Sequence, residues 1–168
     1  MKHAVKIALI GATLAVAGCG DRFGSGASGT GADRFGTSPA GAPSDPASPA
    51  YFQQTVGDRV LFTVNEDTLS PEARQILDGQ ARWLLDNPDY TVRIEGHADE
   101  RGTTEYNIAL GASRASRVQE YLFTQGVAIR RLDTVSFGKE RPIEICSEES
   151  CYAQNRRAVT VLTTGAGL

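Results

Sequence analysis

Residues 95–115, EGHADERGTTEYNIALGASRA, join a short strand pattern to a long helical pattern through a polar loop. The strand pattern occupies residues 90–95, where apolar and polar side chains alternate. The helical pattern starts after Thr103 or Thr104, either of which supplies an N-cap hydroxyl, and continues to about Thr124. A strand that leads directly into a long helix restricts the chain to architectures in which helices pack on a sheet.

The rest of the C-terminal two thirds repeats this alternation. Residues 59–64 are rich in β-branched and aromatic side chains, which predicts a strand. A helix begins with the Ser70-Pro71 capping pair and stops at Asn87-Pro88. Strands are also expected at 132–137 and 158–162, with a short helix or loop between them. This order predicts an α/β (α+β) sandwich, β-α-β-α-β-β, whose helices pack on one four-stranded mixed sheet.

The helix after the polar loop has two neighbouring stripes of side chains. The apolar stripe, predicted to face the core, consists of Ile108, Ala112, Ala115, Val118 and Leu122. The second stripe consists of Asn107, Leu110 and Arg114. We expect the helix to bury the first stripe and to present Asn107 and Arg114 beside Asp99 in the loop.

The N-terminal residues 1–18 have the marks of an export signal. Lys2 and Lys6 precede the apolar run IALIGATLAVAG, which is too short to span a bilayer because a spanning helix needs about 20 residues. The small residues before Cys19 resemble a bacterial lipobox, which implies cleavage before Cys19 and its lipidation. An ordinary signal peptide with an incidental cysteine is the alternative. Gly20, rather than Asp, follows the cysteine, which by the lipoprotein sorting rule favours the outer membrane.

Residues 19–50 consist mainly of Gly, Ala, Ser and Pro and have almost no bulky apolar side chains. Such a segment cannot bury enough surface to offset the entropy of ordering it. We therefore expect a flexible linker at 19–50 and a folded domain at 51–168.

The charge of the chain argues against nucleic acid as a partner. There are 17 Lys+Arg and 20 Asp+Glu residues, for a net charge of -3. Without Lys2 and Lys6 the balance is 15 against 20, or -5. Binding to a nucleic-acid backbone depends on clustered basic residues, and a mildly acidic domain lacks that excess.

The polar loop and the helix carry the spaced pattern D-x2-G-x4-N-x2-L-x3-R-A, which begins at Asp99 and ends at Arg114-Ala115. The segments EGHADERGT, NPDY, GKERP and NRRAV accompany it. Over residues 59–162 the chain therefore resembles the OmpA-like peptidoglycan-binding domain, specifically that of the peptidoglycan-associated lipoproteins of the Tol-Pal system. The lipobox and the linker are similar to that family as well.

This resemblance implies a binding site for meso-diaminopimelate of the peptidoglycan stem peptide, whose free end has an ammonium and a carboxylate. Asp99 is expected to bind the ammonium, and Arg114 the carboxylate in a bidentate manner. The resemblance gives Asn107 a hydrogen-bonding role and Leu110 a backbone or apolar contact. The resemblance further implies that Arg156 adds positive charge nearby and that Phe62, Thr63 and Val64 form the opposing wall of the site.

The resemblance further implies an outer-membrane, lipid-anchored protein with its domain in the periplasm, which links the membrane to the cell wall without being an enzyme. Its implied partners are peptidoglycan and TolB, which compete for overlapping surface, and no cofactor is implied. The chain departs from the family in the opposing wall. Thr63, Asn65 and Thr68 stand where relatives often have acids, so Asp99 is expected to bear more of the ammonium binding.

Other interpretations of these residues are open. Asp99 and Arg114 form a simple ion pair in one of them, and in another His97 and Asp99 bind a metal in a periplasmic cell-wall hydrolase. Two ligands on one loop do not complete a tetrahedral site, and the domain sequence has no further histidine, so we expect no metal. His97 is instead expected to pack beneath the loop with a hydrogen bond to the backbone.

Cys146 and Cys151 enclose the four residues SEES. In an oxidising compartment a disulfide is the natural interpretation, with free thiols or a redox pair as the alternative. Closing so short a loop stabilises the fold by about 2 kcal/mol in the chain-entropy account.

Overall fold

The structure, a computed structural model, describes residues 42–164. The predicted signal peptide, Cys19 and most of the predicted linker lie outside this range. Four strands form one mixed sheet in the order β1-β4-β2-β3. β2 runs parallel to β3, and β4 is antiparallel to both β1 and β2. The strands are β1 (Arg59–Leu61), β2 (Tyr90–His97), β3 (Leu132–Gly138) and β4 (Arg157–Thr164).

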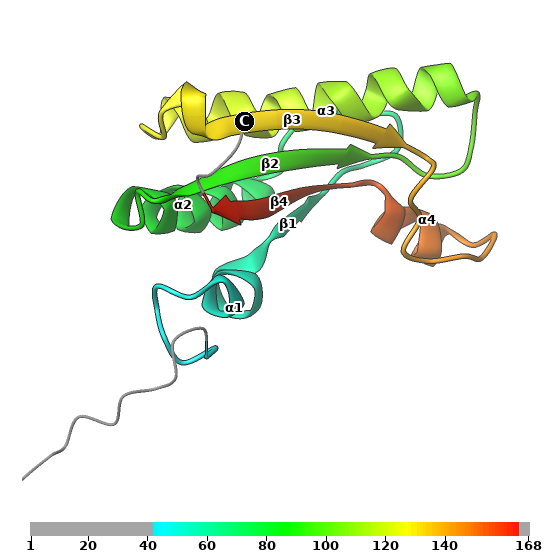
Figure 1. Ribbon diagram of the computed structural model, residues 1–168. Coiled ribbons are helices and arrows are strands. Elements are labelled where there is room, and N and C mark those ends of the chain that lie inside the picture. Colours follow the sequence, from blue (N-terminus) through cyan, green and yellow to red (C-terminus); the bar gives the residue numbers. More distant parts are fainter. Residues whose placement is uncertain (1–41, 165–168) are drawn as a thin grey trace, which may run out of the picture. The chain divides into compact units, whose positions relative to one another are not determined.

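The two long helices pack together with the sheet in one core, so the expected fold class is confirmed (Figure 1). Within residues 42–164 no helix has the length and apolar character needed to cross a membrane. The helical elements are α1 (Pro49–Tyr51), the π-helical turn η1 (Phe52–Gly57), α2 (Pro71–Asp86), α3 (Thr104–Thr124), the short helix η2 (Ile129–Arg131) and α4 (Glu149–Asn155).

Local capping determines where α2 and α3 begin, as the sequence predicted. The Ser70 hydroxyl accepts a hydrogen bond from the Ala73 N–H at 3.1 Å, with Pro71 at the first helical position. The Thr103 hydroxyl accepts one from the Tyr106 N–H at 3.2 Å. Each cap satisfies a backbone donor that has no partner within the helix.

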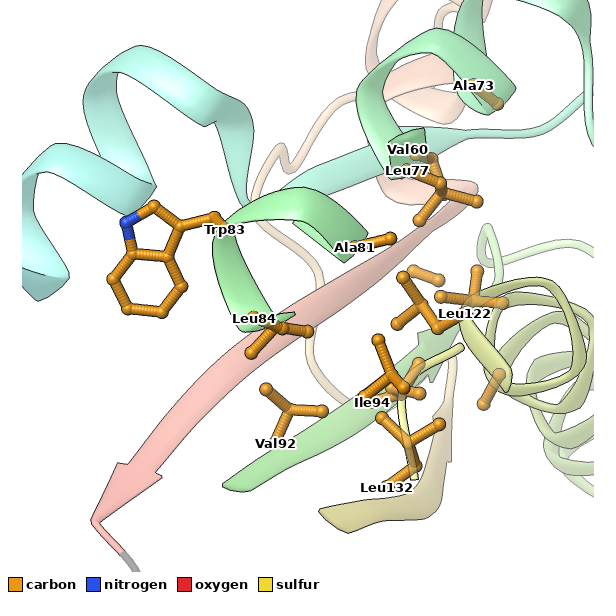
Figure 2. Close-up of a cluster of buried hydrophobic side chains, with 14 of the residues drawn as sticks. Val60, Ala73, Leu77, Ala81, Trp83, Leu84, Val92, Ile94, Leu122 and Leu132 are labelled. Carbon is orange, nitrogen blue, oxygen red and sulfur yellow. The ribbon is translucent and has the colours of Figure 1, made fainter. Parts of the chain in front are cut away.

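The core lies between the helices and one face of the sheet. Figure 2 shows Leu77 and Leu84 of α2 directed toward Ile94 of β2 and Leu122 of α3. All four side chains are at most 1% exposed. The strands contribute alternate residues to this face, as a pleated strand with one buried side must.

The expected assignment of faces on α3 is wrong at its N-terminal half. The residues that are buried are Asn107, Gly111, Arg114, Ala115, Val118 and Leu122, whereas Ile108 is 38% exposed and Ala112 lies on the surface. The cause is a close approach of backbones: a Cβ on Gly96 of β2 would lie 1.8 Å from the carbonyl oxygen of Gly111. The face of α3 that contains Gly111 therefore packs on the sheet, and Asn107 and Arg114 are buried with it.

Ordered contacts begin before Tyr51, within the segment expected to be linker. Trp83 Nε1 donates a hydrogen bond to the Pro46 carbonyl at 2.7 Å, and Ser48 is 2% exposed. The rings of Phe52 and Trp83 are 4.8 Å apart. Residues 46–52 therefore pack against the C-terminal half of α2.

Cys146 and Cys151 form a disulfide with their Cα atoms 5.9 Å apart, which confirms the predicted pairing. Cys151 belongs to α4, so the bond ties the preceding loop to this short helix.

Candidate functional site

Asp99 lies just beyond the C-terminal end of β2, where the strand pairing becomes irregular. The register of β2 against β3 shifts between Gly96 and His97, and the Ala98 N–H donates to the Gly138 carbonyl at 2.8 Å. These contacts hold the chain in place up to Asp99, which is only 7% exposed. A buried carboxylate needs strong partners to remain charged.

Two arginines supply those partners. Arg101 donates from its backbone N–H and from Nε to Asp99 Oδ1, at 3.1 and 3.3 Å, and from Nη2 to Oδ2 at 2.7 Å. Arg156 Nη1 donates to Oδ2 at 3.2 Å. Burial by itself raises the pKa of Asp99, but the hydrogen bonds from Arg101 and Arg156 outweigh it and bring the pKa below its ordinary value.

Arg156 connects Asp99 to the loop after β1. Its Nε donates to the Phe62 carbonyl at 3.1 Å, and its own carbonyl accepts from the Phe62 N–H at 2.9 Å. Nη2 donates to Glu149 of α4. The side chain is only 6% exposed, so Arg156 is a fixed cation at the junction of β1, α4 and β4.

Arg114 is completely buried and is bonded to the backbone. It donates to the carbonyls of Glu66 and His97, each at 2.8 Å, and of Thr63 at 3.1 Å. Its guanidinium carbon lies 5.2 Å from the centre of the Phe62 ring. Burial, and secondarily the charge of Arg156, lowers the pKa of Arg114 to about 10, which leaves the side chain protonated.

Arg114 thus holds the loop at 63–66 against the end of β2. The expectation that α3 presents this side chain on an open face is wrong, because its exposed fraction is 0%. Among the ion pairs of residues 42–164, those of Asp99 are with Arg101 and Arg156 and not with Arg114. The simple Asp99–Arg114 ion pair is therefore not what the structure contains.

Asn107 and Leu110 lie on the same side of α3. Asn107 is 1% exposed, and its Nδ2 donates to the Arg101 carbonyl at 2.8 Å, which holds the loop that carries Asp99. Leu110 is half-buried.

The loop expected to form the opposing wall lies next to both buried arginines. Phe62 is buried, whereas Thr63 is exposed and Val64 is 44% exposed. The Thr63 hydroxyl donates to Glu66 Oε2 at 2.6 Å, which closes a tight turn. Asn65 within it has φ of 56°, a left-handed conformation that Asn adopts more readily than most residues. The carbonyls of this loop accept hydrogen bonds from Arg114 and Arg156, and the Phe62 ring is the loop side chain that lies against Arg114.

Sequence reasoning did not single out Arg101, Glu149 or Tyr152. Arg101 lies two residues after Asp99 and forms a bidentate contact with its carboxylate. Nothing in the sequence pattern of the loop distinguishes Arg101 from a solvated loop residue. Its guanidinium carbon stacks 4.5 Å from the centre of the Tyr152 ring, and Nη2 is 3.6 Å from Glu149 Oε2. These contacts join the loop to α4, which lies far along the sequence, so periodicity alone does not reveal them.

His97 is 2% exposed, and neither ring nitrogen has a hydrogen-bond partner. The expected hydrogen bond from its ring to the backbone is therefore wrong. Burial, with smaller effects of Arg157 and Arg141, lowers the pKa of His97 to about 4, so the ring is neutral at pH 7. Within the described residues no three His, Cys, Asp or Glu side chains are grouped to hold a metal ion.

Comparison with known proteins first defines the class. The model of the OmpA family matches residues 61–156, so the chain belongs to that family. The C-terminal domain of Helicobacter pylori MotB has a TM-score of 0.60 at 22% identity, covering 65% of this chain and 86% of that chain. At that identity the likeness shows a shared fold alone.

More similar proteins define the branch of the family. A peptidoglycan-associated lipoprotein of Rhizobium meliloti (strain 1021) is 46% identical over 168 residues, covering 99% of this chain and 90% of the relative. The crystal structure of the peptidoglycan-associated lipoprotein from Burkholderia pseudomallei has a TM-score of 0.64 at 36% identity, covering 72% of this chain and 98% of that chain. Within the OmpA family, the chain thus belongs with the peptidoglycan-associated lipoproteins.

Proposed function

We propose that this chain is an outer-membrane lipoprotein whose domain binds peptidoglycan without covalent linkage, through the diaminopimelate of the stem peptide, and is not an enzyme. The observation that carries the proposal is the convergence of one buried carboxylate, Asp99, with the guanidiniums of Arg114 and Arg156 around a single loop. Acid and bases held together in this way match a ligand whose end is a zwitterion.

In this proposal Asp99 binds the ligand ammonium and Arg114 binds the ligand carboxylate. A guanidinium has five N–H donors, and the three backbone carbonyls use one each. The remaining donors suit a carboxylate, but Arg114 is buried, so the loop at 63–66 has to shift for a ligand to reach them. Thr63 and Val64, which are exposed, are the residues that such a ligand meets first.

The chain segments have complementary roles in the proposal. Residues 1–18 act as a lipoprotein signal, Cys19 receives the lipid anchor, and the part of the linker that precedes the packed residues 46–52 lets the domain reach the wall from the membrane. In the Tol-Pal system the domain also binds TolB, so that the chain helps the outer membrane follow the wall during constriction in cell division.

Co-sedimentation of the purified full chain, in mild detergent, with isolated peptidoglycan tests the binding. We expect Asp99→Asn to reduce the bound fraction at least tenfold, because an amide has no charge to pair with the ammonium. The matched control is Asp133→Asn, which removes an exposed carboxylate paired with Arg93 on β2. Equal binding by the two variants contradicts the site, and the appearance of soluble muropeptides contradicts a non-enzymatic role.

A further inference from the structure

The carboxylate of Asp99 has no free acceptor position in this structure. Its two oxygens receive hydrogen bonds from the backbone, Nε and Nη2 of Arg101 and from Nη1 of Arg156. A carboxylate accepts about four hydrogen bonds in total. A ligand ammonium can therefore bind Asp99 only if one of these donors leaves.

The two arginines differ in how easily a ligand can displace their guanidiniums from Asp99. Arg156 has a side chain that is 6% exposed, and it also donates to the Phe62 carbonyl and to Glu149. The Arg101 side chain is 45% exposed, and its closest partner is Asp99. Moving Arg101 leaves no buried group without a partner apart from Asp99 itself, and the ammonium then satisfies Asp99.

A place for the displaced guanidinium is present on α4. Glu149 Oε2 is already 3.6 Å from Arg101 Nη2, and the Tyr152 ring lies beneath the guanidinium carbon at 4.5 Å. The Tyr152 hydroxyl donates to Glu100 at 3.0 Å, which holds the ring, and the Cys146–Cys151 disulfide ties α4 to the loop before it. Face stacking and a carboxylate together are good partners for an arginine.

We propose that Arg101 is a displaceable gate on the binding site: the ammonium end of the ligand replaces the Arg101 guanidinium on Asp99, and Arg101 moves to Glu149 and Tyr152. This inference rests on the proposed peptidoglycan function and adds a residue that determines specificity. A ligand with a neutral group in place of the ammonium does not replace a guanidinium on a carboxylate, so the gate excludes it.

The test uses the full chain in detergent micelles and two probes. One is a muropeptide that ends in meso-diaminopimelate, and the other is the same muropeptide with the terminal amine acetylated. The NMR signal of Arg101 Nε–H reports the gate directly. We expect it to shift on saturation with the first probe and to stay unchanged with the second.

Variants give a second measurement. Arg101→Gln removes the competitor of the ammonium, so its affinity for the first probe is expected to rise about threefold to tenfold. The control Arg130→Gln removes an exposed arginine on η2 and is expected to leave the affinity unchanged. Trp83 fluorescence verifies that both variants fold.

The outcomes separate the two proposals. Binding of the first probe with an unmoved Arg101 signal, or weaker binding by Arg101→Gln than by Arg130→Gln, overturns the gate and leaves the peptidoglycan function standing. Absence of binding by the unmodified chain overturns both.

Discussion

Replacing Arg114 by Ala is expected to destabilise the fold and not only to weaken binding. The side chain is 0% exposed and donates to three backbone carbonyls, of Thr63, Glu66 and His97. Each hydrogen bond from a charged donor is worth about 1.5–3 kcal/mol, and the carbonyls left without a donor add a desolvation cost.

Part of this loss is offset, because the variant no longer keeps a guanidinium out of water, which costs several kcal/mol. We therefore expect a net decrease of about 3–5 kcal/mol in the free energy of unfolding. The assay is urea-induced unfolding at pH 7 followed by the fluorescence of Trp83, the one tryptophan of the chain.

The matched control is Arg117→Ala, on the same helix. The Arg117 side chain is 54% exposed, its partner Glu120 is 66% exposed, and its partner Asp67 is half-buried. Surface ion pairs contribute little to stability, so this variant is expected to unfold at the same urea concentration as the original chain. If Arg114→Ala behaves like Arg117→Ala, the structural role assigned to the buried guanidinium is wrong.

Three further predictions concern other parts of the fold. The pKa of His97 falls from 6.5 to about 4 on folding, so up to about 3 kcal/mol of the free energy of unfolding present above pH 6.5 is lost as the pH falls toward 4. His97→Phe should therefore make the urea midpoint less dependent on pH between pH 7 and 5. An unchanged pH dependence would argue against the shift. Cys146→Ser should lower the free energy of unfolding by about 2 kcal/mol under oxidising conditions and by nothing once the original chain is reduced with dithiothreitol. Gly96→Ala should prevent folding, as seen by circular dichroism, because its Cβ would overlap the Gly111 carbonyl. The control Gly79→Ala, in the middle of α2, should be tolerated, because the nearest atom to its Cβ is 3.4 Å away on a Val56 side chain.

Features that depend on neighbouring residues were predictable from the sequence. Ser70 and Thr103 begin their helices because a hydroxyl at the N-cap satisfies a nearby N–H whatever the rest of the fold does. The alternation in β2 likewise follows from one buried face. The close spacing of Cys146 and Cys151 made their disulfide predictable in the same way. The placement of Asp99 in a loop at a strand end follows from the same local pattern.

The orientation of α3 was predicted wrongly in its N-terminal half, because hydrophobicity favoured burial of the apolar stripe that contains Ile108 and Ala112. The contact of Gly96 with Gly111 selected the face, and neither glycine has a side chain that would enter a hydrophobic pattern. Asn107 and Arg114 were buried as a consequence, and both found backbone carbonyls as acceptors.

By itself, the sequence determined the order and ends of the main elements, the family resemblance and the acid in the polar loop, since these depend on short-range patterns. Only the tertiary structure decided the hydrogen-bond partners of each charged side chain. Asp99 accepts hydrogen bonds from both Arg101 and Arg156, while Arg114 donates to backbone carbonyls of the loop at 63–66. The physical reason is that a buried charge takes the partners that folding brings within hydrogen-bond distance, and in this domain those partners come from distant parts of the chain.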